Sequence, residues 1–303
     1  MSNILSALIP IFSLILLGYF FKKIKFPAYE FWPLADKLTY YILMPALLIS
    51  KLKDANLNAK ESFYYILSAL LMIFIVLLAM LIVNKILKFN PKSFTSIVQG
   101  GIRFNTYVFL ALSASFFSSK GLVLAAILLT FVIPFNNIIC ISIFAIFVNE
   151  DRFSFTYLFK MIFKNPLIIA CIIGGTLAFF QINLPLSANK IIFTLSQAAL
   201  PMGLMSVGFG LVIKEIKAKK LEIFVSCFVK LFLSIIVIYL LGRYFLLNKT
   251  MLSLLLIFAS LPTAPSSFVL ARQERGDVSL MSSIITLETI LSFFVLSFVL
   301  NFY

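Results

Sequence analysis

The chain has 303 residues, of which 62% are hydrophobic and 12% are charged, and its formal net charge is +14. A soluble domain carries about twice that share of charged residues, so the composition excludes an ordinary soluble fold. The apolar residues come in runs long enough to cross a bilayer as helices, each of which needs about 20 residues. These runs are continuous rather than alternating, which excludes a transmembrane β-barrel.

Ten apolar segments are predicted to be membrane-spanning helices. They cover residues 4–21, 34–52, 63–83, 94–117, 121–148, 166–183, 191–213, 221–241, 251–271 and 278–300. Connections after the odd-numbered segments carry more than twice as many Lys and Arg residues as connections after the even-numbered ones. By the positive-inside rule the first set faces the cytoplasm, so both termini are expected to be extracytoplasmic. The first segment has no basic residue before it and is expected to be retained.

Prolines and chain breaks recur in the two halves of the chain at a nearly constant offset. The matching pairs are Pro27 with Pro185, Pro45 with Pro201, Asn105 with Thr263 and Gly121 with Gly276. Because five segments is an odd number, a second copy must enter the membrane from the opposite side. The predicted architecture is an all-α integral membrane protein with ten transmembrane helices, a plan that recurs in secondary transporters. Its parts are a first five-helix repeat at 1–148, a short cytoplasmic connection at 149–164 and a second, inverted five-helix repeat at 165–303.

The fourth segment of each half is interrupted by residues that disfavour a helix. The interruptions are Gly100-Gly101-Ile102-Arg103-Phe104-Asn105-Thr106 and Ser260-Leu261-Pro262-Thr263-Ala264-Pro265. Freed backbone groups inside a bilayer are tolerated where they line a cavity or meet protein or water. A half-helix that begins after such a break points unpaired N–H groups at the site, which suits an anion. Two interrupted helices at corresponding positions predict a transporter site near the bilayer midplane; the alternative is a pair of proline kinks that serve packing.

Both interruptions carry a recognisable family motif. Residues Gln99 to Tyr107, with the Asn105-Thr106 pair, and residues Ser260 to Ala271, with Leu261-Pro262, resemble the fourth-span and ninth-span motifs of the auxin efflux carrier family. Pro45 and Pro201 match the proline-bearing second and seventh spans. The family includes plant PIN-type auxin exporters and bacterial malonate and malate permeases.

The resemblance implies two inverted five-helix repeats, with segments 4 and 9 broken and crossing. It implies that segments 1, 2, 6 and 7 form a scaffold, that segments 3–5 and 8–10 form a moving transport domain, and that the protein is a homodimer. The chain departs from the plant exporters in its short connection between segments 5 and 6. It also lacks the later proline of their fourth span, where Leu110 to Ser113 stand. The bacterial organic-acid branch therefore fits better than auxin transport.

The predicted substrate site lies at the two interruptions. From the first, Asn105 and Thr106 supply hydrogen-bond donors and acceptors, unless they serve to hold two helices together. From the second, the expected contacts are backbone N–H groups beside Pro262 and the residues that follow it, Thr263, Ala264, Pro265 and Ser266. Pro45 and Pro201 are interpreted as helix breaks.

Two ionisable residues inside the segments have open roles. Arg103 is too deep for easy snorkelling, so it either clamps a substrate carboxylate with its guanidinium or pairs with Glu288. Glu288 either partners Arg103 or binds a coupling proton or sodium ion, and Gln99 shares one helical face with Arg103. Lys230 is placed within snorkelling reach of an interface and receives no role.

Three amides near segment prolines are secondary candidates for lining the cavity: Asn136, Asn137 and Gln197. Metal binding and redox chemistry find no support, because the chain has no His and its three Cys residues show no paired spacing. No cofactor, no enzymatic activity and no nucleic acid partner are expected.

The hypothesis from the sequence is a secondary transporter of small organic anions, such as malonate or malate, in a bacterial inner membrane. Its partners would be the substrate, the lipid bilayer, a second copy of the chain and a proton or sodium ion. The alternatives are a sodium-coupled symporter of larger amphipathic anions and a membrane receptor that binds a ligand without moving it.

Overall fold

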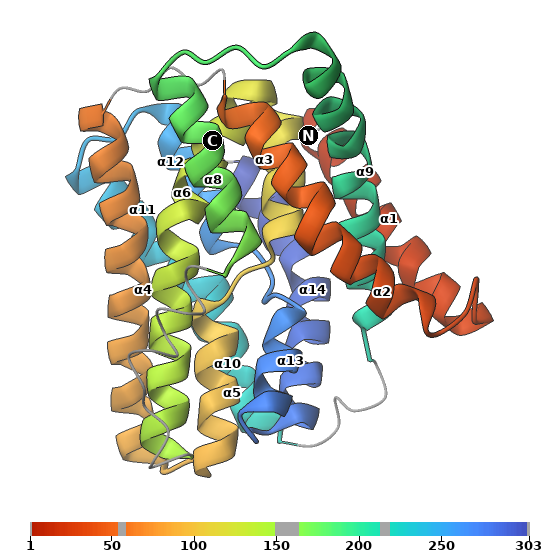
Figure 1. Cartoon of the computed structure of the whole chain (residues 1–303). Helices are drawn as coiled ribbons and strands as arrows, with labels where there is room; N and C mark the ends of the chain where they lie inside the picture. The colour runs from red at the N-terminus through yellow and green to blue at the C-terminus, as the bar shows by residue number, and fades with distance from the viewer. Residues whose placement is uncertain (1, 54–58, 149–163, 213–218, 302–303) are drawn as a thin grey trace.

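The computed structural model describes residues 2–53, 59–148, 164–212 and 219–301, so nearly all of the predicted connection at 149–164 lies outside the described residues. The described secondary structure is helical throughout (Figure 1). Its elements are α1 (Ser2–Ile24), α2 (Phe31–Leu38), η1 (Thr39–Leu43), α3 (Met44–Leu52), α4 (Ala59–Leu87), α5 (Pro91–Ile102), α6 (Thr106–Phe147), α8 (Pro166–Phe179), α9 (Leu186–Gly210), α10 (Lys220–Phe228), η3 (Val229–Leu233), α11 (Ser234–Tyr244), α12 (Lys249–Ala259), α13 (Ser266–Gln273) and α14 (Val278–Asn301).

Each of the ten predicted segments falls on helices of the described chain. Six stretches are apolar and long enough to cross a membrane, and α8 and α12 are shorter apolar helices. The longest stretch, Pro91–Phe147, contains both the fourth and the fifth predicted segments. Within it, α6 bends at Ser118, whose φ of 51° and ψ of −141° are not helical. This bend lies at the predicted boundary between those two segments.

Asparagine side chains begin four of the helices. In each case the side-chain Oδ1 accepts a hydrogen bond from a backbone N–H of the first turn, which satisfies donors that the helix itself leaves unpaired. The capping residues are Asn90 for α5, Asn105 for α6, Asn165 for α8 and Asn248 for α12. Proline follows two of them, at the first helical position where its missing N–H does no harm.

Pro45 and Pro201 do not interrupt their helices, which corrects the interpretation of both as helix breaks. Pro201 lies inside the continuous helix α9. Pro45 lies in the first turn of α3, directly after the π-helical turn η1, in which the Met44 N–H donates to the Thr39 carbonyl. Because the wider π turn moves the carbonyls relative to the proline ring, the chain can continue as a helix.

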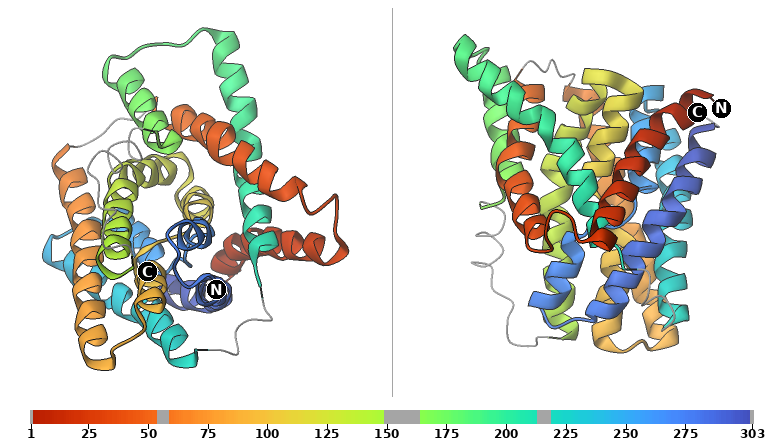
Figure 2. Two further views of the ribbon diagram at one scale, coloured as in Figure 1. Left: turned by 60° about the horizontal axis from the view of Figure 1, so that its bottom comes forward. Right: turned by 90° about the vertical axis from the view of Figure 1, so that its right-hand side faces the viewer.

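The helices pack in two groups. In the first, α1 packs against α9, and α3 packs against both α8 and α9. In the second, α4 packs on α11, α5 packs on α10 and α14, and α12 packs on α11. The left-hand view of Figure 2 shows the first group along one side of the second, and α6 contacts helices of both groups. The candidate site lies between the two groups.

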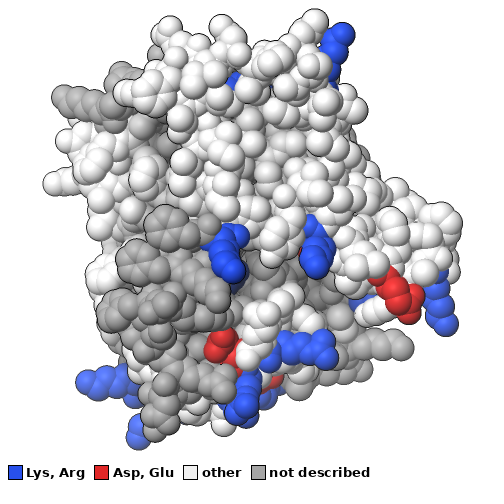
Figure 3. All heavy atoms as spheres, viewed as in Figure 1, with Lys and Arg blue, Asp and Glu red and all other residues white. Residues whose placement is uncertain are grey.

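The outer surface is largely apolar. Large hydrophobic side chains that face outward include Leu16, which is 64% exposed, and Phe179, which is 82% exposed. Such a surface is typical of a protein that lies in lipid rather than in water. The visible face in Figure 3 is nearly free of charged residues in its upper part, and most of its Lys and Arg side chains lie in its middle and lower parts. The first described residues of α1 and the last of α14 lie at the same end of the molecule (Figure 2).

Asp277 joins three helices at the end of the molecule opposite the termini. Its carboxylate accepts hydrogen bonds from Ser93 at the start of α5 (2.9 Å) and from the backbone N–H of Leu280 in α14 (3.1 Å). It also forms an ion pair with Lys219, just before α10. Burial acts to raise the pKa of Asp277, but the hydrogen bonds from Lys219, Leu280 and Ser93 outweigh it, so the pKa lies below its ordinary value. The carboxylate therefore ties the ends of α5, α10 and α14 together as an anion.

Glycine allows α1 and α9 to approach each other closely. A Cβ added to Gly208 in α9 would lie 1.7 Å from the Ile15 carbonyl oxygen in α1. A backbone atom cannot rotate away as a side chain can, so the two helices would have to separate. By contrast, a Cβ added to Gly210, one half-turn further along α9, meets nothing within 4 Å.

Gly208→Ala is therefore expected to destabilise the protein by about 1–3 kcal/mol, the usual range for overpacking a well-packed contact. The measurement is the midpoint of thermal unfolding in detergent, which should fall by several degrees. Gly210→Ala is the matched control and should unfold at nearly the wild-type temperature. Equal midpoints for the two variants would contradict the α1–α9 packing described here.

Candidate functional site

The two interrupted segments meet inside the molecule. The chain is extended at Arg103 between α5 and α6, and it is non-helical between α12 and α13. The backbone N–H of Asn105 donates to the Pro262 carbonyl (2.8 Å), and the Thr263 hydroxyl donates to the Gly100 carbonyl (2.7 Å). Each interruption therefore satisfies backbone groups that the other one frees, which is what a low-dielectric environment requires.

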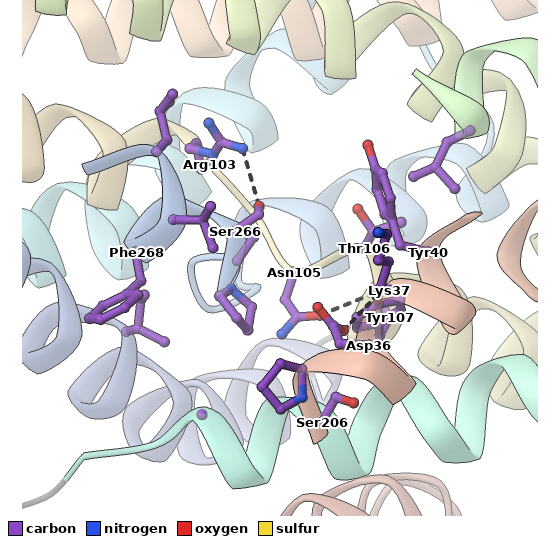
Figure 4. Close-up of a pocket in the computed structure, with 18 of the residues that line it drawn as sticks. Asp36, Lys37, Tyr40, Arg103, Asn105, Thr106, Tyr107, Ser206, Ser266 and Phe268 are labelled. Carbon is purple, nitrogen blue, oxygen red and sulfur yellow. Dashed lines mark hydrogen bonds between the residues drawn. The ribbon is translucent and has the colours of Figure 1, made fainter. Parts of the chain in front are cut away.

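A cavity of about 860 Å³ opens beside this meeting point. Its lining comes from α1, α2, η1, α6, α8, α9, α13, α14 and the two interruptions, so both helix groups contribute to it (Figure 4). The polar and charged residues of the lining are Lys22, Tyr29, Asp36, Lys37, Tyr40, Tyr41, Arg103, Asn105, Thr106, Tyr107, Asn136, Asn137, Lys164, Asn165, Ser206, Ser266, Gln273 and Ser282. Four of these carry a positive charge and one carries a negative charge, so the cavity is electrostatically suited to an anion.

Asn105 has a hydrogen-bond donor without a partner at the cavity. Its side chain is 1% exposed, and its Oδ1 accepts from the backbone N–H groups of Tyr107 (3.1 Å) and Val108 (3.2 Å). These two donors determine which end of the amide is oxygen, and therefore where the NH2 group points. The Nδ2 atom is buried and makes no hydrogen bond. A buried donor without a partner is costly, unless a ligand accepts from it.

Arg103 is the first residue of the non-helical segment between α5 and α6, two residues before Asn105. Its Nη2 donates to the Ser266 hydroxyl oxygen at 3.2 Å, which joins the two interruptions through side chains (Figure 4). Arg103 also interacts with the buried Cys140 thiol in α6. Because a guanidinium has five N–H donors, others are left for a ligand. The hydroxyl hydrogen of Ser266 is free to donate, because the bond from Arg103 uses the oxygen as acceptor.

Asp36 and Tyr107 connect α2 and α6 beside the cavity. The Tyr107 hydroxyl in α6 donates to Asp36 Oδ1 in α2 at 3.2 Å (Figure 4). Asp36, Lys37 and Tyr40 also line the cavity, and the sequence did not predict them as site residues. A signal was present, since an ionisable residue inside a predicted membrane segment is by default a functional candidate, and Asp36 and Lys37 stand in segment 34–52.

The structure brings most of the predicted site residues to the cavity. The residues that line it are Arg103, Asn105, Thr106, Asn136, Asn137, Ala264, Pro265 and Ser266. Asn136 also donates from Nδ2 to the Ile102 carbonyl (3.0 Å), which satisfies the last carbonyl of α5. Gln197 is exposed on α9 and is not part of the lining, which corrects its prediction as a cavity residue. The helical periodicity of α9 turns Gln197 away from the cavity that Ser206 and Phe209 line.

Pro262 and Thr263 lie behind the cavity wall rather than in it. The Thr263 side chain is fully buried, and its backbone N–H donates to Glu288 Oε2 (3.0 Å). The expectation of a free backbone N–H beside Pro262 is therefore wrong for Thr263, because a carboxylate of the protein already accepts from it. Gln99 is buried as well, and neither of its side-chain polar atoms has a hydrogen-bond partner.

Of the two partners predicted for Arg103, the structure favours the cavity over Glu288. Arg103 bonds to Ser266, whereas the Glu288 carboxylate accepts from Ser226 (3.1 Å) and Thr263. The cation that interacts electrostatically with Glu288 is Lys230. Lys230 is 1% exposed, so the expectation that it snorkels to an interface is wrong. Its helix packs inside the second group, and the side chain interacts with Phe258 of α12 and Glu288 of α14.

The fold and the cavity define a multi-pass membrane protein with a cavity whose lining holds more basic than acidic residues. A family model described as "Membrane transport protein" matches residues 3–300, so the chain belongs to that family. This confirms the resemblance to auxin efflux carriers seen in the two interruptions. The chain is also 30% identical over 132 residues to the "Putative malonate transporter" of Rhizobium meliloti (strain 1021). That match covers 42% of this chain and 40% of the relative, so the chain spans less than half of the relative's length in the alignment.

Proposed function

We propose that the protein is a secondary transporter that carries small organic anions with one or two carboxylates, such as malonate or malate. The observation that carries the proposal is the buried, unpartnered amide of Asn105 in a cavity where basic residues outnumber acidic ones. Family membership supports transport, and the name of the R. meliloti relative supports the choice of malonate as the first substrate to test. No enzymatic step is part of the proposal.

In the proposed complex one carboxylate lies between Asn105 and Arg103. The Asn105 Nδ2 group and the Arg103 guanidinium donate to its oxygens, and the hydroxyls of Thr106 and Ser266 complete the contacts. A charge-assisted hydrogen bond contributes about 1.5–3 kcal/mol, so two of them contribute about 3–6 kcal/mol, which corresponds to binding in the millimolar to sub-millimolar range. The basic residues Lys37 and Lys164 at the cavity wall would attract a second carboxylate.

Transport would follow alternating access between the two helix groups. In this proposal the chain is two inverted five-helix repeats with ten crossings. The group of α1, α2, η1, α3, α8 and α9 is the scaffold, and the group that carries both interruptions moves as an elevator. The cavity between the groups supports this division, because the ligand would contact the moving group at Asn105 and the scaffold at α2. We further propose a homodimer in a bacterial inner membrane, with both termini extracytoplasmic.

The test is counterflow of labelled malonate and malate in proteoliposomes that contain the purified protein. The proposal expects saturable exchange that unlabelled organic anions inhibit and that protein-free liposomes lack. In parallel, substrates should raise the thermal unfolding midpoint, because a ligand of the folded state stabilises it by mass action. Thermal stabilisation without counterflow would instead identify a receptor, and uptake of large amphipathic anions alone would favour the symporter alternative.

A further inference from the structure

A second polar cluster is buried behind the cavity, among α5, α10, α12 and α14. At its centre is Glu288, which is fully buried and receives hydrogen bonds from the Ser226 hydroxyl and from the Thr263 backbone N–H. Thr263 belongs to the second interruption, so the carboxylate anchors that interruption directly. Glu288 is not part of the cavity lining.

The cluster also reaches the first interruption. Thr263 donates from its hydroxyl to the Gly100 carbonyl, near the end of α5 (2.7 Å). A Cβ added to Gly100 would lie 1.9 Å from the Ser226 hydroxyl oxygen, so glycine at this place gives Ser226 the room to reach Glu288. The Thr263 hydroxyl therefore joins the two interruptions, and the buried Glu288 carboxylate holds the Thr263 backbone in place.

Lys230 supplies the cation for this carboxylate. It lies four residues after Ser226, in the π turn η3, and is 1% exposed. Its Nζ lies 5.9 Å from the centre of the Phe258 ring, in the last turn of α12 before the second interruption. Within the part of the chain that the structure describes, the titratable groups that interact electrostatically with Glu288 are Lys230 from η3 and the Cys227 thiol from α10. Of these two, Lys230 is the one that can carry a positive charge.

A buried carboxylate in a membrane must be neutralised by a bound cation, by a proton or by a charged side chain. We propose that Lys230 is a built-in cation that occupies the place beside Glu288 where a sodium ion or a coupling proton would otherwise bind. Glu288 is then a positioning residue that holds the second interruption whatever cations are present outside. For transport, which rests on the function proposed above, the consequence is anion movement that sodium does not drive through this carboxylate.

The experiment compares the purified wild-type protein with Lys230→Gln and with the double variant Lys230→Gln/Glu288→Gln. The first readout is the thermal unfolding midpoint in sodium chloride and in choline chloride at equal ionic strength, between pH 5 and pH 8. The wild-type midpoint should be the same in both salts. In Lys230→Gln the carboxylate has lost its partner, so its midpoint should fall. That midpoint should recover at low pH, where a proton neutralises Glu288, or in sodium chloride, where a sodium ion can enter.

The double variant separates charge compensation from simple packing. A glutamine at 288 can accept from the Thr263 N–H through Oε1 and donate from Nε2 to the Ser226 hydroxyl oxygen. The double variant should therefore be more stable than Lys230→Gln and insensitive to sodium and pH. If Lys230→Gln alone cannot be purified, recovery of folded protein in the double variant supports the proposal. A double variant that is no more stable than Lys230→Gln overturns it. So does a wild-type protein that sodium stabilises, or a Lys230→Gln variant that responds to sodium and pH as the wild type does.

The second readout is anion counterflow in proteoliposomes with sodium or choline on both sides. The wild type should exchange anions equally in both salts, and Lys230→Gln should gain a dependence on sodium or on low pH. If the wild type exchanges no organic anion, the proposed function fails, while the thermal measurements still decide the role of Lys230. If the wild type exchanges anions in sodium alone, the proposed function stands and the role of Lys230 is overturned.

Discussion

Uptake of organic anions should fall at least about 100-fold when Asn105 is replaced by aspartate. Aspartate keeps the Oδ oxygen that caps α6 through Tyr107 and Val108, so the helix start is preserved. It replaces the buried Nδ2 donor by a second carboxylate oxygen, which faces the substrate carboxylate. Opposed like charges cost several kcal/mol, and each 1.4 kcal/mol is a factor of ten in binding. The measurement is the initial rate of malonate counterflow in proteoliposomes.

Asn90→Asp is the matched control for this variant. Asn90 caps α5 in the same way, through the Lys92 backbone N–H, but it lies outside the cavity. Asn90→Asp should therefore transport at nearly the wild-type rate. Asn105→Ala removes both the cap and the donor, so it should lose transport and also unfold at a lower temperature. Wild-type transport rates in a folded Asn105→Asp variant would contradict the assignment of Asn105 as a residue that binds the substrate.

A rise of about 10- to 100-fold in the half-saturating concentration of substrate is expected for Arg103→Gln. The variant removes a charged donor whose bonds to a carboxylate contribute about 1.5–3 kcal/mol. Its hydrogen bond to Ser266 is exposed to the cavity and its other side-chain partner is the weakly bonding thiol of Cys140, so the thermal unfolding midpoint without substrate should change little. The measurement is the concentration dependence of counterflow, with the unfolding midpoint as the check on folding.

Arg103→Lys is the informative comparison. Lysine keeps the positive charge but lacks the planar pair of donors that holds a carboxylate through two parallel bonds. An intermediate affinity is expected if the guanidinium contacts the substrate. Wild-type affinity in Arg103→Gln would mean that Arg103 serves to hold Ser266 and α13 rather than the ligand.

The sequence predicted the helices well because apolar runs of this length leave a chain few alternatives. Each apolar segment falls on helix apart from the two interruptions, and the boundary between segments 94–117 and 121–148 coincides with the bend at Ser118. Prolines were less informative. Pro262 and Pro265 lie where helix stops, whereas the helices continue past Pro45 and Pro201. The difference depends on whether a neighbouring π turn or packing can accommodate the ring, and sequence spacing does not report that.

The site was predicted in part. Asn105, Arg103 and Ser266 could be found because they stand at the interruptions, and the structure places all three at one cavity. Asp36 and Lys37 on α2 are charged residues in an apolar segment, which marks them as functional candidates. The sequence did not show that they line the same cavity as Asn105. Residues from α2 and α6 meet through tertiary packing alone.

By itself, then, the sequence determined that this chain is a helical membrane protein with two matching interruptions, since apolar length and proline chemistry act locally. Tertiary structure decided the partners. Glu288 lies with Lys230 rather than Arg103, Thr263 donates to that carboxylate rather than to a ligand, and the Nδ2 donor of Asn105 has no partner at the cavity. The physical reason is that each buried polar group must find a partner from another helix, and which helices are neighbours is a property of the packed molecule.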